Sequence, residues 1–120
     1  MARQAGPEPQ EPFKRITAAQ AWRMLQRSDS VVVDVRQLDE WVQGHVKGAI
    51  HIPVDDIINR IDELPTGKNL LFICAQGVRS ALACEMAAAM GRLPEKLFNI
   101  EDGTPAWIAH KYSTSYHREP

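Results

Sequence analysis

The chain has 120 residues, 14 of them basic and 15 acidic, with a formal net charge of -1 at pH 7. This length suits a single domain that folds without disulfide cross-links, and the balanced charge gives no reason to expect nucleic acid or an acidic membrane as a partner. Two cysteines favour a reducing compartment, the cytoplasm, and no stretch approaches the ~18 consecutive apolar residues of a membrane span.

The chain begins with a polar segment. Residues 1–12 contain three prolines and no apolar cluster, so we expect a flexible leader and not a signal peptide or a membrane anchor. The patterned part of the chain runs over 13–110, which is the predicted domain. Residues 111–120 are expected to form a polar C-terminal tail.

The first predicted element is a helix over 18–27. Residues 17–20 form a capping-box pattern, in which the side chains of Thr17 and Gln20 bind each other's backbone N–H groups. Apolar side chains then recur with the spacing of one helix face: Ala18, Ala21, Trp22 and Leu25.

Two strands follow this helix. The β-branched run 31–35 is typical of a strand that is covered on both faces of a parallel sheet, and Asp34 is its anomaly. A short strand is predicted over 49–52, where Pro53 ends it. A helix is expected next over 57–64, from four apolar residues at helical spacing: Ile57, Ile58, Ile61 and Leu64.

The second half of the chain alternates in the same way. We predict a buried strand over 70–73, a long helix over 78–90, a strand over 97–100, and a short helix that starts with Pro105 after the capping residue Thr104. On the long helix, the larger apolar residues are expected to face the core: Leu82, Met86 and Met90.

Strands that alternate with helices predict an α/β fold, in which a mostly parallel central sheet carries helices on both faces. In such sheets the ligand site lies beyond the carboxyl ends of the strands. Three of these ends carry polar or reactive residues. We therefore expect one edge of the sheet to bring together Asp34 and Arg36, Cys74, and residues 101–103.

Cys74 is the candidate nucleophile. It lies between the strand 70–73 and the long helix, where the backbone N–H groups of the loop and the positive end of the helix both stabilise a thiolate. Such a setting brings the pKa of a cysteine from ~8.5 to roughly 3.5–7.5. An isolated buried cysteine is more often inert packing, but here Gly77, Arg79 and a helix start accompany the thiol.

Four motifs, in this order, resemble the rhodanese homology domain. They are Asp34-Val35-Arg36 with Glu40-Trp41, the stretch 44–53, the loop 74–80, and Asp102-Gly103 with Trp107. The resemblance covers nearly the whole chain outside its two ends. It implies a rhodanese-like domain and a sulfurtransferase that carries sulfur as a persulfide on Cys74, with no metal and no organic cofactor. The partners it implies are a small sulfur-donor anion such as thiosulfate, or a protein persulfide, and a thiol or cyanide acceptor.

The residues of the loop agree with this chemistry. A Cys74 thiolate can attack the outer sulfur of a donor, and converging N–H groups stabilise the negative charge at each stage. Gly77 allows the loop to close, and the charge of Arg79 can either clamp a substrate or brace Glu40 or Glu101. Substrate contacts are expected from six residues: Ala75, Gln76, Gly77, Val78, Arg79 and Ser80.

Three charged residues are expected to support the loop as a network behind it: Asp34, Arg36 and Glu40. Direct catalysis by these carboxylates is disfavoured, because a lone buried carboxylate beside Cys74 would raise the pKa of its thiol.

The remaining cysteine and two of the histidines are assigned structural roles. Cys84 lies ten residues after Cys74. That separation is about 15 Å along a helix, which is too far for an easy disulfide, so Cys84 is interpreted as packing. His45 and His51 lack partners with metal-ligand spacing.

Two departures from the family pattern bear on the substrate. Asp102 stands where the family usually has a second glycine, and a carboxylate near the site would weaken the binding of anionic donors. The loop also has no lysine. Thiosulfate turnover is therefore less well supported than persulfide carriage.

Three alternative functions remain open. Phosphatases and arsenate reductases on a similar scaffold have five residues between cysteine and arginine, whereas four separate Cys74 from Arg79 here, and the smaller ring suits sulfur better than phosphate. A binding or regulatory module is a second alternative, although the loop cysteine is present. The third is a redox sensor that forms sulfenic acid, although no resolving cysteine is near.

Overall fold

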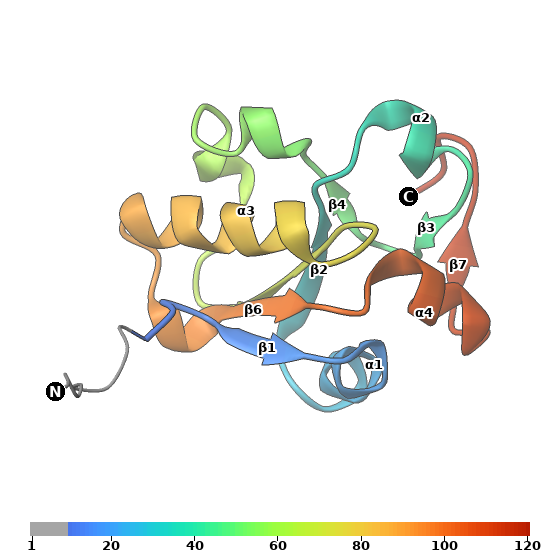
Figure 1. Ribbon diagram of the computed structural model, residues 1–120, viewed down its shortest axis with the longest axis horizontal. Coiled ribbons are helices and arrows are strands. Elements are labelled where there is room, and N and C mark those ends of the chain that lie inside the picture. The colour runs from blue at the N-terminus through green and yellow to red at the C-terminus, as the bar shows by residue number, and fades with distance from the viewer. Residues whose placement is uncertain (1–9) are drawn as a thin grey trace, which may run out of the picture.

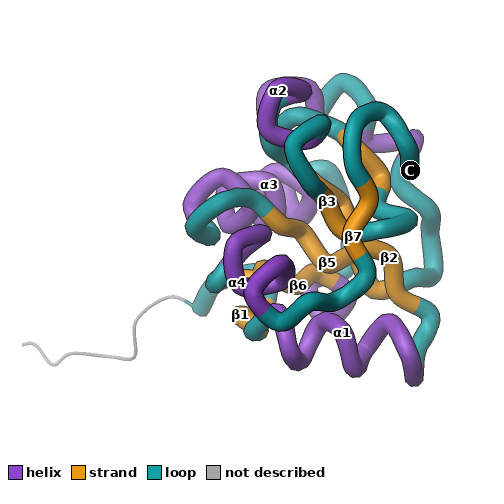
Figure 2. The backbone as a smooth tube through the Cα atoms, turned by 90° about the vertical axis from the view of Figure 1, so that its right-hand side faces the viewer, coloured by secondary structure: helices purple, strands orange, loops and turns teal. Residues whose placement is uncertain are grey.

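The structure is a computed structural model that describes residues 10–120. Five parallel strands form a sheet in the order β1-β6-β5-β2-β4. A separate antiparallel pair joins β3 to β7, and Figure 2 shows the two side by side. The bounds of the strands are β1 Lys14–Ile16, β2 Ser30–Asp34, β3 His45–Val46, β4 Ile50–His51, β5 Asn69–Ile73, β6 Leu97–Ile100 and β7 Thr114–Ser115.

Helices cover both faces of the sheet, which confirms the predicted α/β fold. One core cluster joins α3 to one face, and a second cluster joins α1 and α4 to the other (Figure 1). Within residues 10–120, no helix combines the length and apolar character needed to cross a membrane. The helices are α1 Ala18–Arg27, α2 Leu38–Trp41, α3 Val78–Ala89 and α4 Gly103–Ala109, with 3₁₀ turns η1 Val54–Asp56, η2 Ile61–Glu63 and η3 Pro94–Lys96.

The apolar run of β5 is explained by burial on both faces. Leu70 and Phe72 pack in the cluster that contains α3, while Leu71 and Ile73 pack in the cluster that contains α1. Successive side chains of a strand point to opposite faces, so a strand at the centre of a two-sided core needs apolar residues throughout.

The parallel register brings the carboxyl ends of three strands to one edge. Asp34 pairs with Ile73, and Ile73 pairs with Ile100, so β2, β5 and β6 end level with one another. The residues that follow these ends, Cys74 among them, are therefore neighbours in space although they are distant in sequence.

Helix α1 begins as predicted. The Thr17 hydroxyl accepts a hydrogen bond from the Gln20 backbone N–H at 3.1 Å, and the Gln20 side chain accepts one from the Thr17 N–H at 2.8 Å. A third free N–H at this end, that of Ala18, donates to the carboxylate of Asp102 at 2.7 Å. The last contact ties the start of α1 to the segment after β6.

The helix predicted over 57–64 is wrong. The chain instead forms a turn over 57–60, in which the Arg60 N–H donates to the Asp56 carbonyl at 2.9 Å, and then the 3₁₀ turn η2, whose capping N–H donates to the carbonyl three residues earlier. Apolar residues three or four apart suit such turns as well as an α-helix, and Pro53 and Pro65 confine the segment from both sides. Three of its four apolar residues are buried as expected, and Ile58 is exposed.

The predicted core face of α3 is wrong for two of its three residues, whereas Met86 is half-buried and packs against the core as expected. Leu82 and Met90 are each 46% exposed, whereas the buried residues of this helix are small: Ser80, Ala83, Cys84 and Ala87. Small side chains let the helix lie close to the sheet without a void. Cys84 is part of that face, so its interpretation as a packing residue agrees with its position.

Four short elements were not predicted: β1, α2, β3 and β7. Their sequences are too short or too charged to show a period. The last of them falls in the segment predicted as a polar tail over 111–120, where β7 pairs with β3 and the His117 N–H donates to the Val42 carbonyl at 2.7 Å. The predicted leader over 1–12 lies mostly outside the described residues.

The contact between Asp102 and α1 gives a test of the fold. Asp102→Ala removes a cap from a helix N-terminus, so we expect it to lower the free energy of unfolding by about 1 kcal/mol. Asp102→Asn keeps an acceptor and should stay closer to the wild type. Urea denaturation measures both, and equal losses in the two variants would contradict the capping role.

Candidate active site

The candidate site is built on the loop that joins β5 to α3. Cys74 follows β5 directly, and Gly77 precedes α3 with a φ of +84°. A Cβ at Gly77 would lie 2.7 Å from the carbonyl oxygen of Glu101. The turn therefore needs glycine for its conformation and for the close approach of a second loop.

The sulfur of Cys74 is surrounded by hydrogen-bond donors. The backbone N–H of Gly77 donates to Sγ at 3.1 Å, and the N–H of Ser80 donates to it at 3.4 Å. The Ser80 hydroxyl oxygen lies 3.3 Å from Sγ. The expectation that the loop turns its N–H groups toward the sulfur agrees with this geometry.

These contacts decide the ionisation of the thiol. Burial alone raises the pKa of Cys74, but hydrogen bonds from the Ser80 hydroxyl and from the backbone N–H groups of Ser80, Gln76 and Gly77 outweigh it and lower the pKa below its ordinary value. Among residues 10–120, no hydrogen-bond donor lowers the pKa of Cys84. Burial raises the pKa of the Cys84 thiol far above the ordinary value, so this thiol stays protonated.

Cys74 lies at the floor of a cleft. Only 1% of its surface is exposed. The cleft has a volume of about 300 Å³ and is lined by Cys74, Ala75, Gln76, Val78 and Arg79. A second cleft, of about 410 Å³, shares Ala75 and extends past Gly44 and Ile108. A sulfur this deeply placed can be reached by a terminal atom of a substrate more readily than by a bulky group.

Two ion pairs flank the loop, where a single charge network was expected. Arg79 binds both carboxylate oxygens of Glu40, at 2.7 and 2.9 Å, and Arg36 binds Asp34 at 2.8 Å. The hydrogen bond from Arg79 lowers the pKa of Glu40 to about 2. Of the roles left open for Arg79, this geometry favours bracing Glu40.

The loop after β6 packs against the cysteine loop. Thr104 donates to the Cys74 carbonyl through its N–H at 2.9 Å and through its hydroxyl at 3.3 Å. Gly103 has a φ of +70°, and a Cβ there would lie 2.2 Å from the carbonyl oxygen of Ala75. The carboxylate of Asp102, expected to disturb the site, instead binds the Ala18 N–H.

Asn99 is a site residue that the sequence analysis missed. It is buried in β6, donates through Nδ2 to the Gly77 carbonyl at 3.1 Å, and accepts from the Ser80 hydroxyl at 2.5 Å. A usable signal was present, because Asn99 is the one polar residue in the buried run Leu97–Ile100, beside the strand that carries Cys74.

The two histidines of the stretch 44–53 contact backbone carbonyls. His45 Nδ1 lies 2.6 Å from the Trp41 carbonyl oxygen, and His51 Nε2 lies 2.8 Å from that of Arg36. Within residues 10–120, no three histidine, cysteine, aspartate or glutamate side chains are grouped so as to hold a metal ion.

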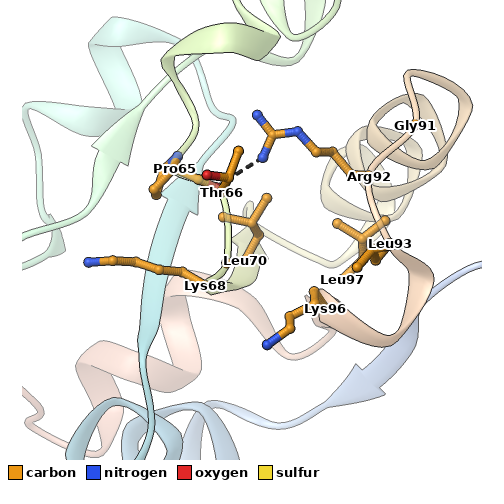
Figure 3. Close-up of a pocket in the computed structure, with 10 residues that line it drawn as sticks. Pro65, Thr66, Lys68, Leu70, Gly91, Arg92, Leu93, Lys96 and Leu97 are labelled. Carbon is orange, nitrogen blue, oxygen red and sulfur yellow. Dashed lines mark hydrogen bonds between the residues drawn. The ribbon is translucent and has the colours of Figure 1, made fainter.

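A further cavity, of about 210 Å³, lies at the opposite edge of the sheet, where β5 and β6 begin (Figure 3). Its walls include Leu70, Leu93 and Leu97, and Arg92 beside them donates to backbone carbonyls. None of the predicted site residues lines it, so the chemistry predicted from the sequence belongs to the Cys74 cleft.

Comparisons with known proteins show what this chain is similar to. A family model described as "Rhodanese-like domain" matches residues 17–110. A protein named sulfurtransferase from Allochromatium vinosum is 30% identical over 73% of this chain and 80% of its own length. One named thiosulfate sulfurtransferase GlpE, from Glaesserella parasuis, is 27% identical over 82% of this chain and 90% of its own. The crystal structure of a rhodanese-related protein from Thermoplasma volcanium superposes with a TM-score of 0.73 at 29% identity, covering 86% of this chain and 98% of that one.

The Glu40–Arg79 pair predicts a pH-dependent stability. Because the pKa of Glu40 is lowered from 4.5 to about 2 in the folded state, the pair stabilises the fold fully above pH 4.5 and loses its effect as the pH falls toward 2. Glu40→Gln should therefore lower the free energy of unfolding by about 1 kcal/mol at neutral pH. This difference should shrink between pH 4.5 and 2.

Denaturant unfolding over this pH range measures the effect, with Glu63→Gln as the matched control. Glu63 pairs with Arg60 on the surface, where its side chain is 53% exposed, so its loss should matter less. A Glu40→Gln difference that stays constant down to pH 2 would contradict the assignment.

Proposed function

We propose that this chain, which belongs to the rhodanese-like domain family and is a rhodanese-type sulfurtransferase, carries sulfane sulfur as a persulfide on Cys74. The observation that supports the proposal most directly is the pair of backbone N–H groups, of Gly77 and Ser80, that donate to Sγ. Donors of this kind stabilise negative charge on a buried sulfur. In the persulfide the charge lies one atom further out, in the cleft that the same loop lines.

The proposed reaction has two steps. The Cys74 thiolate attacks the outer sulfur of the donor, a new S–S bond forms, and the bond between that sulfur and the rest of the donor breaks, so that sulfite or a thiolate leaves with the electron pair. In the second step, the thiolate or cyanide acceptor attacks the outer sulfur of the persulfide. The Cys74 thiolate then departs, and the site is restored.

The cleft suits a donor with a terminal sulfur atom. Thiosulfate and persulfides are both attacked at such a terminal atom. A phosphate is attacked at its central phosphorus, and the ring here is one residue shorter than that of the phosphatases on a similar scaffold. Arg36 and Arg79 already hold carboxylates, so a dianion gains less from them than from free guanidinium groups. This supports a protein or low-molecular-weight persulfide as donor beside thiosulfate, and a thiol or cyanide as acceptor. A reducing cytoplasm, which keeps Cys74 free, is the proposed location.

The proposal predicts one modified residue. After incubation with thiosulfate, mass spectrometry of the intact protein and its peptides should show a gain of ~32 Da on Cys74, because the thiolate retains the transferred sulfur atom. Cys74→Ser should abolish the gain. Cys84→Ala, which removes the other thiol, should keep it.

Other outcomes would identify the alternatives. Hydrolysis of para-nitrophenyl phosphate without sulfur uptake would indicate a phosphatase. Sulfenic acid on Cys74 after peroxide treatment, without sulfur uptake from thiosulfate or a persulfide, would indicate a redox sensor. The absence of all three reactions would leave a binding module.

A further inference from the structure

The side chain of Asn99, in β6, connects Gly77 and Ser80 through hydrogen bonds to both. Its Nδ2 donates to the Gly77 carbonyl at 3.1 Å, and its Oδ1 lies 2.5 Å from the Ser80 hydroxyl oxygen. That oxygen lies 3.3 Å from Cys74 Sγ. Ser80 and Asn99 expose no surface, so solvent does not compete for these contacts.

The chemistry of these groups fixes the direction of each hydrogen. A carbonyl oxygen only accepts, so the Gly77 carbonyl requires the nitrogen of the Asn99 amide and turns Oδ1 toward Ser80. Oδ1 also only accepts. While Cys74 is a thiol, the single hydroxyl hydrogen of Ser80 therefore points to Asn99, and Ser80 presents lone pairs to the sulfur. The Ser80 hydroxyl donates to the sulfur only when the thiolate draws this hydrogen away from Asn99.

Three states of Cys74 respond differently to this arrangement. A thiol completes the chain, because its S–H donates to the Ser80 oxygen. A persulfide also leaves the chain intact, because its charge lies on the outer sulfur and the inner sulfur needs no donor. A free thiolate attracts the Ser80 hydrogen, and when that hydrogen turns to sulfur, Oδ1 of Asn99 is left buried without a donor.

We infer that Asn99 is a positioning residue that competes with the Cys74 thiolate for the hydroxyl hydrogen of Ser80 and so favours the sulfur-loaded cysteine over the free thiolate. The statement about loading rests on the proposed function. The statement about the thiolate does not, because it concerns the resting protein.

Charged side chains also lie on the elements around the loop. The elements around the loop contribute Asp34 and Arg36 from β2 and its end, Glu40 from α2, Asp56 from η1, Arg79 from α3 and Glu101 after β6. Four of these six are joined in the two ion pairs. All six are unchanged in the variants below, so comparison with the wild type removes their contribution.

The test is the pH dependence of the rate at which iodoacetamide alkylates Cys74, in a double-mutant cycle of Asn99→Leu and Ser80→Ala. Without Oδ1, the Ser80 hydrogen is free to serve the thiolate, so Asn99→Leu should lower the midpoint by roughly one pH unit. In the Ser80→Ala background, Asn99→Leu should leave the midpoint unchanged. Ser80→Thr keeps the hydroxyl and should restore the effect of Asn99→Leu.

Two results would overturn the inference. One is a midpoint that stays or rises in Asn99→Leu. The other is an equal shift in the presence and absence of Ser80, which would mean that Asn99 acts only by bracing Gly77. Asn99→Val, whose β-branched side chain suits a strand, serves in place of Asn99→Leu if that variant does not fold.

Ser80→Ala alone gives an independent check. In the wild type, Asn99 offsets most of the effect of the Ser80 hydroxyl on the thiolate, so Ser80→Ala should raise the midpoint of the alkylation profile by well under one pH unit. A rise of one unit or more, which is roughly the full value of a hydrogen bond to an ion, would contradict the competition.

Loading is measured separately, by mass spectrometry at a fixed ratio of thiosulfate to sulfite. The Asn99→Leu protein should be several-fold less loaded at equilibrium than the wild type, and equal or higher loading would contradict the inference. If the wild type takes up no sulfur, the proposed function fails. The alkylation experiment still tests whether Asn99 competes with the Cys74 thiolate for the Ser80 hydrogen.

Discussion

A thiolate at the floor of a narrow cleft is stable only if hydrogen-bond donors replace the water that it has lost. Burial alone raises the pKa of Cys74, and the N–H groups of Gly77 and Ser80 oppose that effect. Those donors act only while the loop keeps its shape. Gly77 supplies the turn, Gly103 allows the second loop to approach, and Thr104 holds the Cys74 carbonyl. Much of the surrounding structure thus serves to keep a few N–H bonds pointed at one sulfur.

The charges around the loop are arranged to support its shape. The guanidinium groups of Arg36 and Arg79 each bind a carboxylate, so the donors nearest the sulfur are the backbone N–H groups of Gly77 and Ser80. Fixed dipoles stabilise a small anion without the bulk of a charged side chain. Such a site suits sulfur transfer, because the negative charge moves only from the Cys74 sulfur to the next sulfur atom when sulfur is taken up, and back when it is released.

The sequence was sufficient for the fold class and for the position of Cys74 at the carboxyl ends of the strands. The carboxyl ends of parallel strands lie at the same edge of the sheet, so the alternation of strands and helices alone predicted that Asp34 and Cys74 are close together. The choice of partner for Arg79 did not, because Glu40 and Glu101 were both within reach of a long side chain. Asp102 was misjudged for a related reason: only the structure shows the N–H of Ala18 beside it. On α3 and over 57–64, apolar spacing was read as an α-helical face, whereas close packing and 3₁₀ turns determine what is buried.

The central claim is that the donors of its loop lower the pKa of the Cys74 thiol below that of a free cysteine. The most direct measurement is a pH titration of the ultraviolet absorbance of the thiolate in Cys84→Ala, where Cys74 is the only thiol. The account predicts one transition with its midpoint below the ~8.5 of a free cysteine, and no transition of this kind when Cys74 is replaced by serine as well. A midpoint at or above ~8.5 would contradict it, because burial would then have outweighed the ring of N–H groups.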